Sequence, residues 1–293
     1  MKQTFLMTAL QIGAKRIPMG LGFALALTFP HLNATAQDVD LATANNYAVL
    51  ANTAISAANP SVVNGGNVGL SPGAASSITG PISITAPYTI DTTDANALQA
   101  QKDLTTAYNV AAGLPVTATL TGVDLGTIST LQNPLAPGVY YFKTSAELTG
   151  TLYLNDGGKP DAVFVFQIGS TLTTASDSKV VTVDSGAPQG SIPGVSVFWQ
   201  VGSSATLGTG TDFEGNILAY TTITDNGGST VEGRLLAETG AVTLNDTTIT
   251  VPPAEVVGGG GGGNVPDTGS TLPLLGFGVV TLFAFRRRFF LLV

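Results

Sequence analysis

Hydroxyl side chains recur at a nearly fixed spacing in the second half of the chain. Residues 204–207 (SATL) are followed 18 positions later by residues 222–225 (TITD), and residues 241–244 (AVTL) follow after a further 19. A hydroxyl both donates and accepts hydrogen bonds, and threonine carries a methyl group beside it. Groups of this kind suit many weak contacts with a hydrogen-bonding surface.

The composition lacks two residue types that commonly catalyse reactions or bind metals, cysteine and, in the predicted mature chain, histidine. The chain has no cysteine, which excludes disulfides and thiolate metal sites. Its one histidine, His31, lies in a predicted export signal that is removed, so histidine bases and histidine ligands are excluded from the mature chain. We therefore predict no catalytic residue, no metal site and no cofactor.

The net negative charge of the predicted mature chain limits the kinds of molecule that can bind to it. Between Gln37 and Asn264 five basic residues stand against 18 acidic ones, which leaves a formal charge of −13. A surface this acidic argues against nucleic acid and anionic lipid headgroups as partners. The basic residues are Lys102, Lys143, Lys159, Lys179 and Arg234.

A longer repeat surrounds the hydroxyl-bearing segments. Residues 213–219 (FEGNILA) reappear as residues 231–237 (VEGRLLA), 18 positions later, and residues 166–173 have an echo in residues 199–206. A period near 20 with alternating apolar and small polar residues is typical of a solenoid, in which each repeat forms one coil. Trp199 in this pattern is predicted to be a core residue.

Strand alternation then decides which hydroxyls point outward. With Ala205, Ile223 and Val242 turned inward, the residues on either side of each must point out. Coils stack about 4.7–4.9 Å apart, so stiff β-branched side chains would form a flat, nearly uncharged grid. Threonine is common in strands of every kind, so the grid also fits a purely structural role. Alternatively, a grid of this kind can order water into an ice-like layer.

The predicted face and its neighbour comprise two sets of residues. The face consists of Thr171, Thr173, Ser204, Thr206, Thr221, Thr222, Thr224, Thr239 and Thr243. A second candidate face consists of Thr209, Thr211, Ser229 and Thr230. The segment 239–243 carries one extra residue, which could bulge the coil and disturb the grid at that edge.

One segment changes from strand to helix periodicity. Between Asp94 and Ala112, apolar or long side chains recur every three to four residues, which predicts a helix with Asp94 as N-cap and Gly113 as its stop. Its stripe must be buried, and one face of the solenoid is the expected partner.

The two ends of the chain read as processing segments. Residues 1–36 predict a signal peptide, because basic residues precede a short apolar core and an Ala-Thr-Ala cleavage site. Residues 37–257 form the predicted β-helix domain and residues 258–264 a glycine-rich linker. Residues 265–293 combine a short motif, an apolar run and three arginines, which predicts a sorting signal; a permanent single-pass anchor is the alternative.

These motifs together resemble the ice-binding-like family from about residue 41 to residue 250. The resemblance lies in residues 46–51, 70–75 with 78–80, 135–140, 163–168, and 213–219 with 232–237. It implies an all-β fold, a right-handed, discontinuous parallel β-helix (solenoid) of triangular section with one long α-helix packed alongside. It also implies ice binding through one flat face, in some members with a Thr-Ala/Gly-x-Thr/Asn pattern that residues 221–224 and 203–206 approach.

The tail resembles exosortase-type sorting signals of Gram-negative envelopes, in the variant with the motif Val-Pro-Asp-Ser/Thr-Gly. The matching residues are Val265, Pro266, Asp267, Thr268 and Gly269, with Arg286, Arg287 and Arg288 as the basic end. The resemblance implies secretion or a cell-surface location, a sorting peptidase as partner, and transient membrane contact through the C-terminal segment.

The sequence thus favours a monomeric, non-enzymatic protein whose partner is ice or ordered water, with inhibition of ice growth and recrystallisation as the outcome. A cell-surface adhesion or matrix module that binds polysaccharide is the alternative. Polysaccharide lyases also use β-helices, but Lys179 and Arg234 are scattered and no acidic cluster has ligand spacing. Arg234 occupies the repeat position that Asn216 holds one coil earlier, which favours a structural role.

Overall fold

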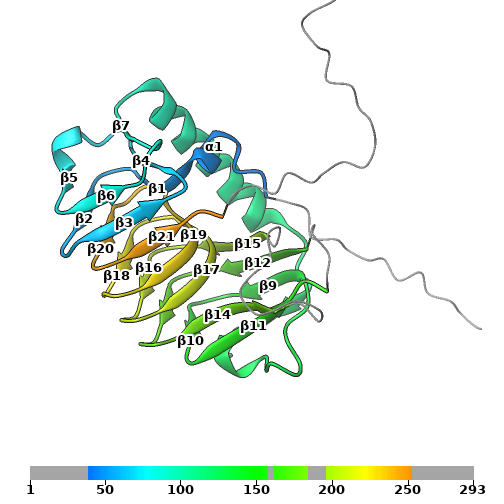
Figure 1. Cartoon of the computed structure of the whole chain (residues 1–293). Helices are drawn as coiled ribbons and strands as arrows, with labels where there is room; N and C mark the ends of the chain where they lie inside the picture. Colours follow the sequence, from blue (N-terminus) through cyan, green and yellow to red (C-terminus); the bar gives the residue numbers. More distant parts are fainter. Residues whose placement is uncertain (1–38, 158–161, 184–195, 253–293) are drawn as a thin grey trace, which may run out of the picture. The chain divides into compact units, whose positions relative to one another are not determined.

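Short strands stack in parallel, coil upon coil, with a single long helix beside them (Figure 1). The computed structural model describes residues 39–157, 162–183 and 196–252. The predicted all-β solenoid with one helix is confirmed. The predicted signal peptide, linker and sorting signal lie outside the described residues, so their boundaries stay predictions.

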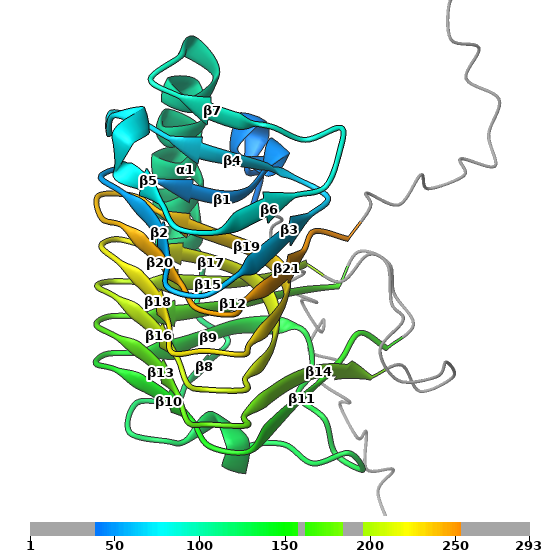
Figure 2. The same ribbon diagram turned by 60° about the vertical axis from the view of Figure 1, so that its left-hand side comes forward.

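One face of the solenoid is a sheet of seven three- or two-residue strands. In spatial order they are β10 (Ala146–Leu148), β13 (Leu172–Thr174), β16 (Ala205–Leu207), β18 (Ile223–Asp225), β20 (Val242–Leu244), β2 (Ile55–Ala57) and β5 (Ile78–Thr79). Figure 2 shows them as a ladder down one side of the stack.

The other strands belong to a 14-stranded sheet that supplies two further faces. The face beside the helix contains β7 (Ile90–Thr92), β4 (Asn67–Leu70), β1 (Tyr47–Ala51), β19 (Thr230–Ala237), β17 (Asp212–Ala219), β15 (Ser196–Val201), β12 (Val163–Ile168), β9 (Gly138–Phe142) and β8 (Ala118–Thr119). The third face contains β6 (Ile82–Ile84), β3 (Ser61–Asn64), β21 (Thr248–Thr250), the first residues of β19 and β17, β14 (Lys179–Val183) and β11 (Thr151–Asn155). Short 3₁₀ helices η1 (Ala42–Asn46), η2 (Ala75–Ser77) and η3 (Leu125–Thr127) complete the described elements.

The register between coils follows the sequence repeat. All eight residues of β17 pair with β19 at a separation of 18, from Asp212 with Thr230 to Ala219 with Ala237. The earlier echo is also real, because Phe166 pairs with Trp199 and Thr173 with Thr206. Trp199 is fully buried and stacks on Phe166 with ring centroids 4.0 Å apart, which confirms its predicted core role.

Two glycines let long strands turn the corner between faces. Gly215 and Gly233 lie in the middle of β17 and β19 with φ of 117° and 147°. A Cβ atom on Gly233 would lie 2.1 Å from the carbonyl oxygen of Gly215. The repeated Glu-Gly pair in the sequence is therefore a corner that only glycine fits without strain.

The order of coils in the stack does not follow the sequence, because the first strands of the domain pair with the last ones. β2 pairs with β20, β3 with β21 and β1 with β19. In Figure 2 the blue strands lie directly on the orange ones. The intervening chain crosses to the opposite end of the stack through the helix, and the later coils then return toward the start.

The helix α1 (Ala95–Gly113) covers the face that contains β12, β15 and β17. The Asp94 carboxylate accepts a hydrogen bond from the Ala97 amide at 2.7 Å, which confirms the predicted N-cap. Leu104 and three buried alanines pack against a sheet surface that includes Val165, Phe198 and Leu218. Gln167 donates to the carbonyls of Ala111 and Leu114 at 2.8 and 2.9 Å, and so satisfies the last turn.

Within the described residues, no helix combines the length and apolarity that crossing a bilayer requires.

Candidate functional site

The seven-stranded sheet presents two rows of side chains to the outside, nearly all of them small, and we call this surface the hydroxyl face. In each three-residue strand the central side chain points out and its neighbours are buried. With Thr79 of β5, these positions form the first row: Glu147, Thr173, Thr206, Thr224, Thr243, Ser56 and Thr79. The residue before each strand supplies the second row: Ser145, Thr171, Ser204, Thr222, Ala241, Ala54 and Ser77.

Hydrogen bonds within the rows orient part of this grid. In the second row the Thr222 hydroxyl donates to the Ser204 hydroxyl at 2.9 Å, and Thr171 donates to Ser145 at 2.8 Å. In the first row, by contrast, the hydroxyls of Thr173, Thr206 and Thr224 have no hydrogen-bond partner among the described residues. Their donors and acceptors therefore remain available to water.

The two remaining residues of the predicted face lie at the corner beside it. The Thr221 hydroxyl is 2.7 Å from that of Ser204 and so extends the second row. The hydroxyl of Thr239 instead donates to the carbonyl of Tyr220. The hydroxyl hydrogen of Thr239 is therefore already used in a hydrogen bond at the corner, although the side chain is exposed.

The extra residue in segment 239–243 does not disturb the grid. Gly240 absorbs it at the corner, where a Cβ would lie 2.4 Å from the carbonyl oxygen of Thr221. Ile223 still pairs with Val242, and Thr224 with Thr243. The expected bulge is thus confined to the turn, and the first row continues across it.

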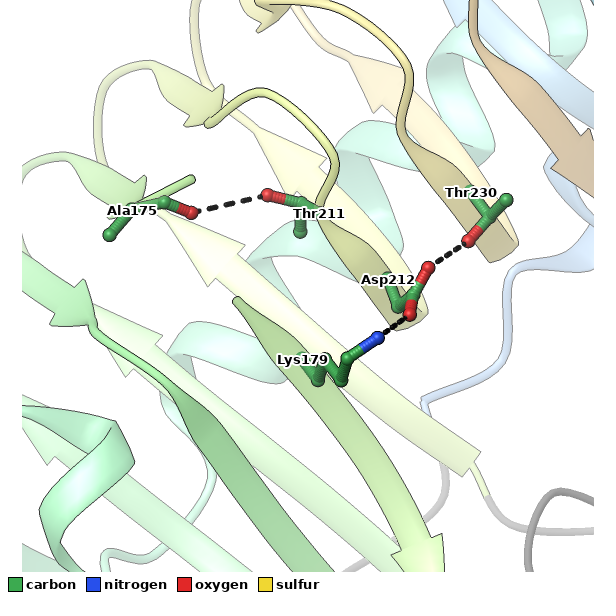
Figure 3. Close-up of polar contacts among 5 residues, drawn as sticks. All are labelled: Ala175, Lys179, Thr211, Asp212 and Thr230. Carbon is green, nitrogen blue, oxygen red and sulfur yellow. Dashed lines mark hydrogen bonds and ion pairs between the residues drawn. The ribbon is translucent and has the colours of Figure 1, made fainter. Parts of the chain in front are cut away.

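The second candidate face is not a surface of hydroxyls. Thr211 and Ser229 are only 0% and 1% exposed, so assigning them to an outward face was wrong. They lie in the turn that connects two faces, where backbone and carboxylate acceptors draw their hydroxyls inward. Thr211 donates to the carbonyls of Gly208 at 2.7 Å and Ala175 at 3.4 Å (Figure 3), and Ser229 donates to Asp225 at 2.5 Å.

The other two members of that set, Thr209 and Thr230, have different surroundings. Thr209 is exposed in the turn after β16. Thr230 begins β19 and donates to Asp212 at 2.6 Å, while the other oxygen of Asp212 pairs with Lys179 (Figure 3). The Lys179 ion pair, followed by the Thr230 hydroxyl, lowers the pKa of Asp212 below its ordinary value. The third face is therefore charged at this point, whereas the hydroxyl face is nearly uncharged.

One carboxylate on the hydroxyl-face strands is turned inward. Asp225 ends β18 and is 2% exposed. It accepts hydrogen bonds from Ser229, from the Gly227 amide at 3.1 Å and from Thr247 at 2.5 Å. Only Glu147, at one end of the first row, adds a charged side chain to the outer rows.

Sequence repeats did not reveal the part of the face made by the N-terminal coils. Ser56 and Thr79 continue the first row beyond Thr243, and Ser77 continues the second. Their strands lie more than 80 residues before the first repeated segment (residues 166–173), so no period links them. The available signal was the shared inward–outward–inward pattern of residues 55–57 (ISA) and 242–244 (VTL).

The described residues contain no group of three or more Asp, Glu, His or Cys side chains placed to hold a metal ion.

Comparison with known proteins gives consistent matches over both parts of the chain. A family model described as ice-binding-like matches residues 49–250, and a model of the VPDSG-CTERM motif matches residues 264–289. The chain is 47% identical over 256 residues to an ice-binding protein of Nostoc sp. (strain HG1), which covers 85% of this chain and 87% of that protein. It is 38% identical over 232 residues to an ice-binding protein of Colwellia sp., which covers 73% and 84% respectively.

Solved structures agree with the fold. The crystal structure of an ice-binding protein from an Antarctic biological consortium superimposes with a TM-score of 0.64 at 38% identity, over 76% of this chain and 96% of that one. An ice-binding protein from an Arctic yeast, whose structure was determined to explain its antifreeze activity, gives 0.60 at 29% identity, over 75% and 99%.

Proposed function

Because the chain belongs to the ice-binding-like family, we propose that it binds ice through the hydroxyl face and thereby inhibits ice growth and recrystallisation. The family is non-enzymatic, which agrees with the absence of cysteine and of histidine outside the predicted signal. The observation that supports this choice of face is the first row, in which seven successive strands each place one outward side chain in register.

The geometry of the rows suits an ordered layer of water. Neighbouring coils place equivalent side chains about 4.7–4.9 Å apart, and the two rows are about 6.6 Å apart along each strand. Threonine offers a methyl group, around which water is ordered, and a hydroxyl, which anchors that water by a hydrogen bond. A rigid parallel sheet fixes both groups before ice arrives, so little conformational entropy is lost on adsorption.

Many weak contacts then act together. Each hydroxyl contributes little by itself, since its hydrogen bond to ice replaces one to liquid water. The rows engage the same crystal at the same moment, so desorption requires that all contacts break at once. A bound protein of this kind blocks the addition of water molecules to the surface beneath it.

The tail supports a location outside the cell. A C-terminal sorting motif is typical of proteins delivered to the cell surface or secreted, and residues 265–269 carry it here with Thr268 where the motif's name has serine. We propose that a sorting peptidase of a Gram-negative envelope acts on this tail after transient membrane contact. The exported domain, which we propose is monomeric, would meet ice at or beyond the cell surface.

The direct test is the shape and recrystallisation of ice crystals in the presence of the full chain and of Thr224→Tyr. Faceted crystals and arrested recrystallisation with the wild type alone are the expected result. Full activity in the folded variant would rule out this face.

A further inference from the structure

A polar cleft lies on the helix side of the solenoid, away from the hydroxyl face. This open cleft of about 700 Å³ is formed by η1, the first turns of α1, the middle of β19, the two residues after β21, and the N-terminal coils. Its volume is within the range of about 300–1,000 Å³ typical of small-molecule sites. Most of the residues that line it have polar side chains, including Asn46, Asn67, Tyr88, Asn96, Gln99 and Arg234.

Arg234 is the unusual residue in this cleft. It is the only arginine between Gln37 and Asn264, in a segment with a formal charge of −13. It sits beside Asn216 of the preceding coil, as the repeat predicts, and its Nη1 donates to the Asn216 Oδ1 at 2.9 Å. Its Nε donates to the carbonyl of Asn45 at 3.2 Å. The guanidinium is therefore held in place from two sides.

No carboxylate is found in an ion pair with this guanidinium in the described part of the chain, whereas Asp212 pairs with Lys179. Burial lowers the pKa of Arg234 to about 10, so the group is still charged at neutral pH. Two of its five N–H groups are engaged, which leaves three without a partner among the described residues. A partly buried cation without a counter-ion is costly, and a planar fork of this kind matches a carboxylate well.

Asp91 also lines the cleft, but it is already engaged. It accepts hydrogen bonds from the Tyr47 hydroxyl at 2.9 Å, from Asn67 at 3.4 Å and from Thr89 at 3.2 Å. Burial, followed by the contact with Asp91, raises the pKa of Tyr47, which keeps this phenol protonated as a donor. Neighbouring side chains thus satisfy the Asp91 carboxylate, whereas Arg234 keeps N–H groups that can bind a ligand.

The remaining lining suits a hydroxyl-rich ligand. Asn46 and Asn96 are exposed, and their amides have no hydrogen-bond partner among the described residues. An amide donates and accepts at once, as adjacent sugar hydroxyls require. Tyr88 is 37% exposed and offers an aromatic ring on which the apolar face of a sugar can rest.

We propose that this cleft binds a carboxylated saccharide, a uronic acid unit of an extracellular polysaccharide. Arg234 holds the carboxylate in a forked pair of hydrogen bonds, Asn46 and Asn96 bind hydroxyls, and Tyr88 contacts the ring. The cleft and the hydroxyl face lie on different sheets, so one molecule can hold both a glycan and ice.

The test is titration calorimetry of the full chain with trigalacturonate, with maltotriose as a neutral ligand of the same length and acetate as the bare anion. We expect trigalacturonate to bind, maltotriose and acetate to bind at least about tenfold more weakly, and Arg234→Gln to lose at least about tenfold in affinity for trigalacturonate. Absence of trigalacturonate binding, or equal binding by Arg234→Gln, would overturn the proposal. Equal binding of acetate would show an anion site that does not recognise sugar, which also overturns it.

Two further variants at surface positions keep the test decisive if Arg234→Gln fails to fold. Asn96→Ala and Tyr88→Ala change exposed residues, so they leave the fold intact and should each weaken trigalacturonate binding severalfold. Thr224→Tyr should bind trigalacturonate as the wild type does, and Asn96→Ala should shape ice as the wild type does. The two proposed activities can therefore fail independently.

Discussion

Ser56 and Thr243 are 187 residues apart in the chain, yet their hydroxyl oxygens are 3.4 Å apart on the same row of the hydroxyl face. Ser56 belongs to the first coil of the domain and Thr243 to the last. The face is therefore assembled from both ends of the domain, and its extent exceeds the threonine repeat that first indicated it.

Thr224→Tyr should abolish ice shaping and recrystallisation inhibition without unfolding the protein. Thr224 lies near the middle of the first row between Thr206 and Thr243, and a tyrosine there would hold the flat rows away from a crystal surface. Its side chain points outward, so the core is unaffected.

The matched control is Thr209→Tyr, at an exposed turn outside the two rows. It should retain full activity in the same recrystallisation assay. If Thr209→Tyr were inactive and Thr224→Tyr active, the binding surface would include the turn and the assignment to the seven-stranded sheet would be wrong.

Ser56→Tyr should reduce activity as Thr224→Tyr does, because Ser56 occupies the same row next to Thr243. Val62→Tyr is its control, since Val62 is exposed on β3 of a different face. Thermal hysteresis at matched protein concentration measures both. An unaffected Ser56→Tyr would limit the ice contact to the C-terminal coils.

Gly233→Ala should destabilise the domain by about 1–3 kcal/mol, since φ of 147° is strained for alanine and its Cβ would collide with the carbonyl of Gly215. Urea unfolding at constant m-value gives the difference. Gly113→Ala provides the contrast: nothing lies within 4 Å of its Cβ and it ends α1, so a gain of about 0.5–1 kcal/mol is expected. Equal effects of the two changes would contradict the corner role of Gly233.

Glu214 should make the domain less stable as the pH rises above the acid range. Burial raises its pKa, outweighing the hydrogen bonds from Thr182, and Glu232 on the next coil adds repulsion. The folded state then holds the proton more tightly than the unfolded state. The contribution of this group to stability is thus complete below the ordinary glutamate pKa and falls as pH rises through the raised folded pKa.

Glu214→Gln removes this titration and should be more stable than the wild type at neutral pH. Urea unfolding of both proteins across the range from acid to neutral pH measures the effect. Parallel curves for the two proteins would show that Glu214 does not titrate differently on folding.

The sequence predicted those parts of the fold that repeat locally. The pairing of β17 with β19 follows from an 18-residue period, and the helix follows from its spacing and from the Asp94 cap. Strand alternation also gave the correct outward residues in β16, β18 and β20. These features depend on neighbours within a single coil or on a fixed shift to the next.

Features that depend on distant pairing or on turn geometry could not be predicted in this way. Ser56 joined the face only because the first coil stacks on the last. Thr211 and Ser229 have the composition of a polar surface, but the turn aims both hydroxyls at buried acceptors. Arg234 was correctly placed beside Asn216, yet the cleft around it is built by η1 and α1, which lie far away in the sequence.

The stacking of the first coil on the last also constrains the order in which the chain can fold. β2 and β3 pair on one side with the nearby β5 and β6, but their partners on the other side, β20 and β21, exist only once residues 242–250 have been synthesised. Such distant pairing is typical of slow folding. A product cut short before β20 would leave the sheet edge of the first coil open to other chains.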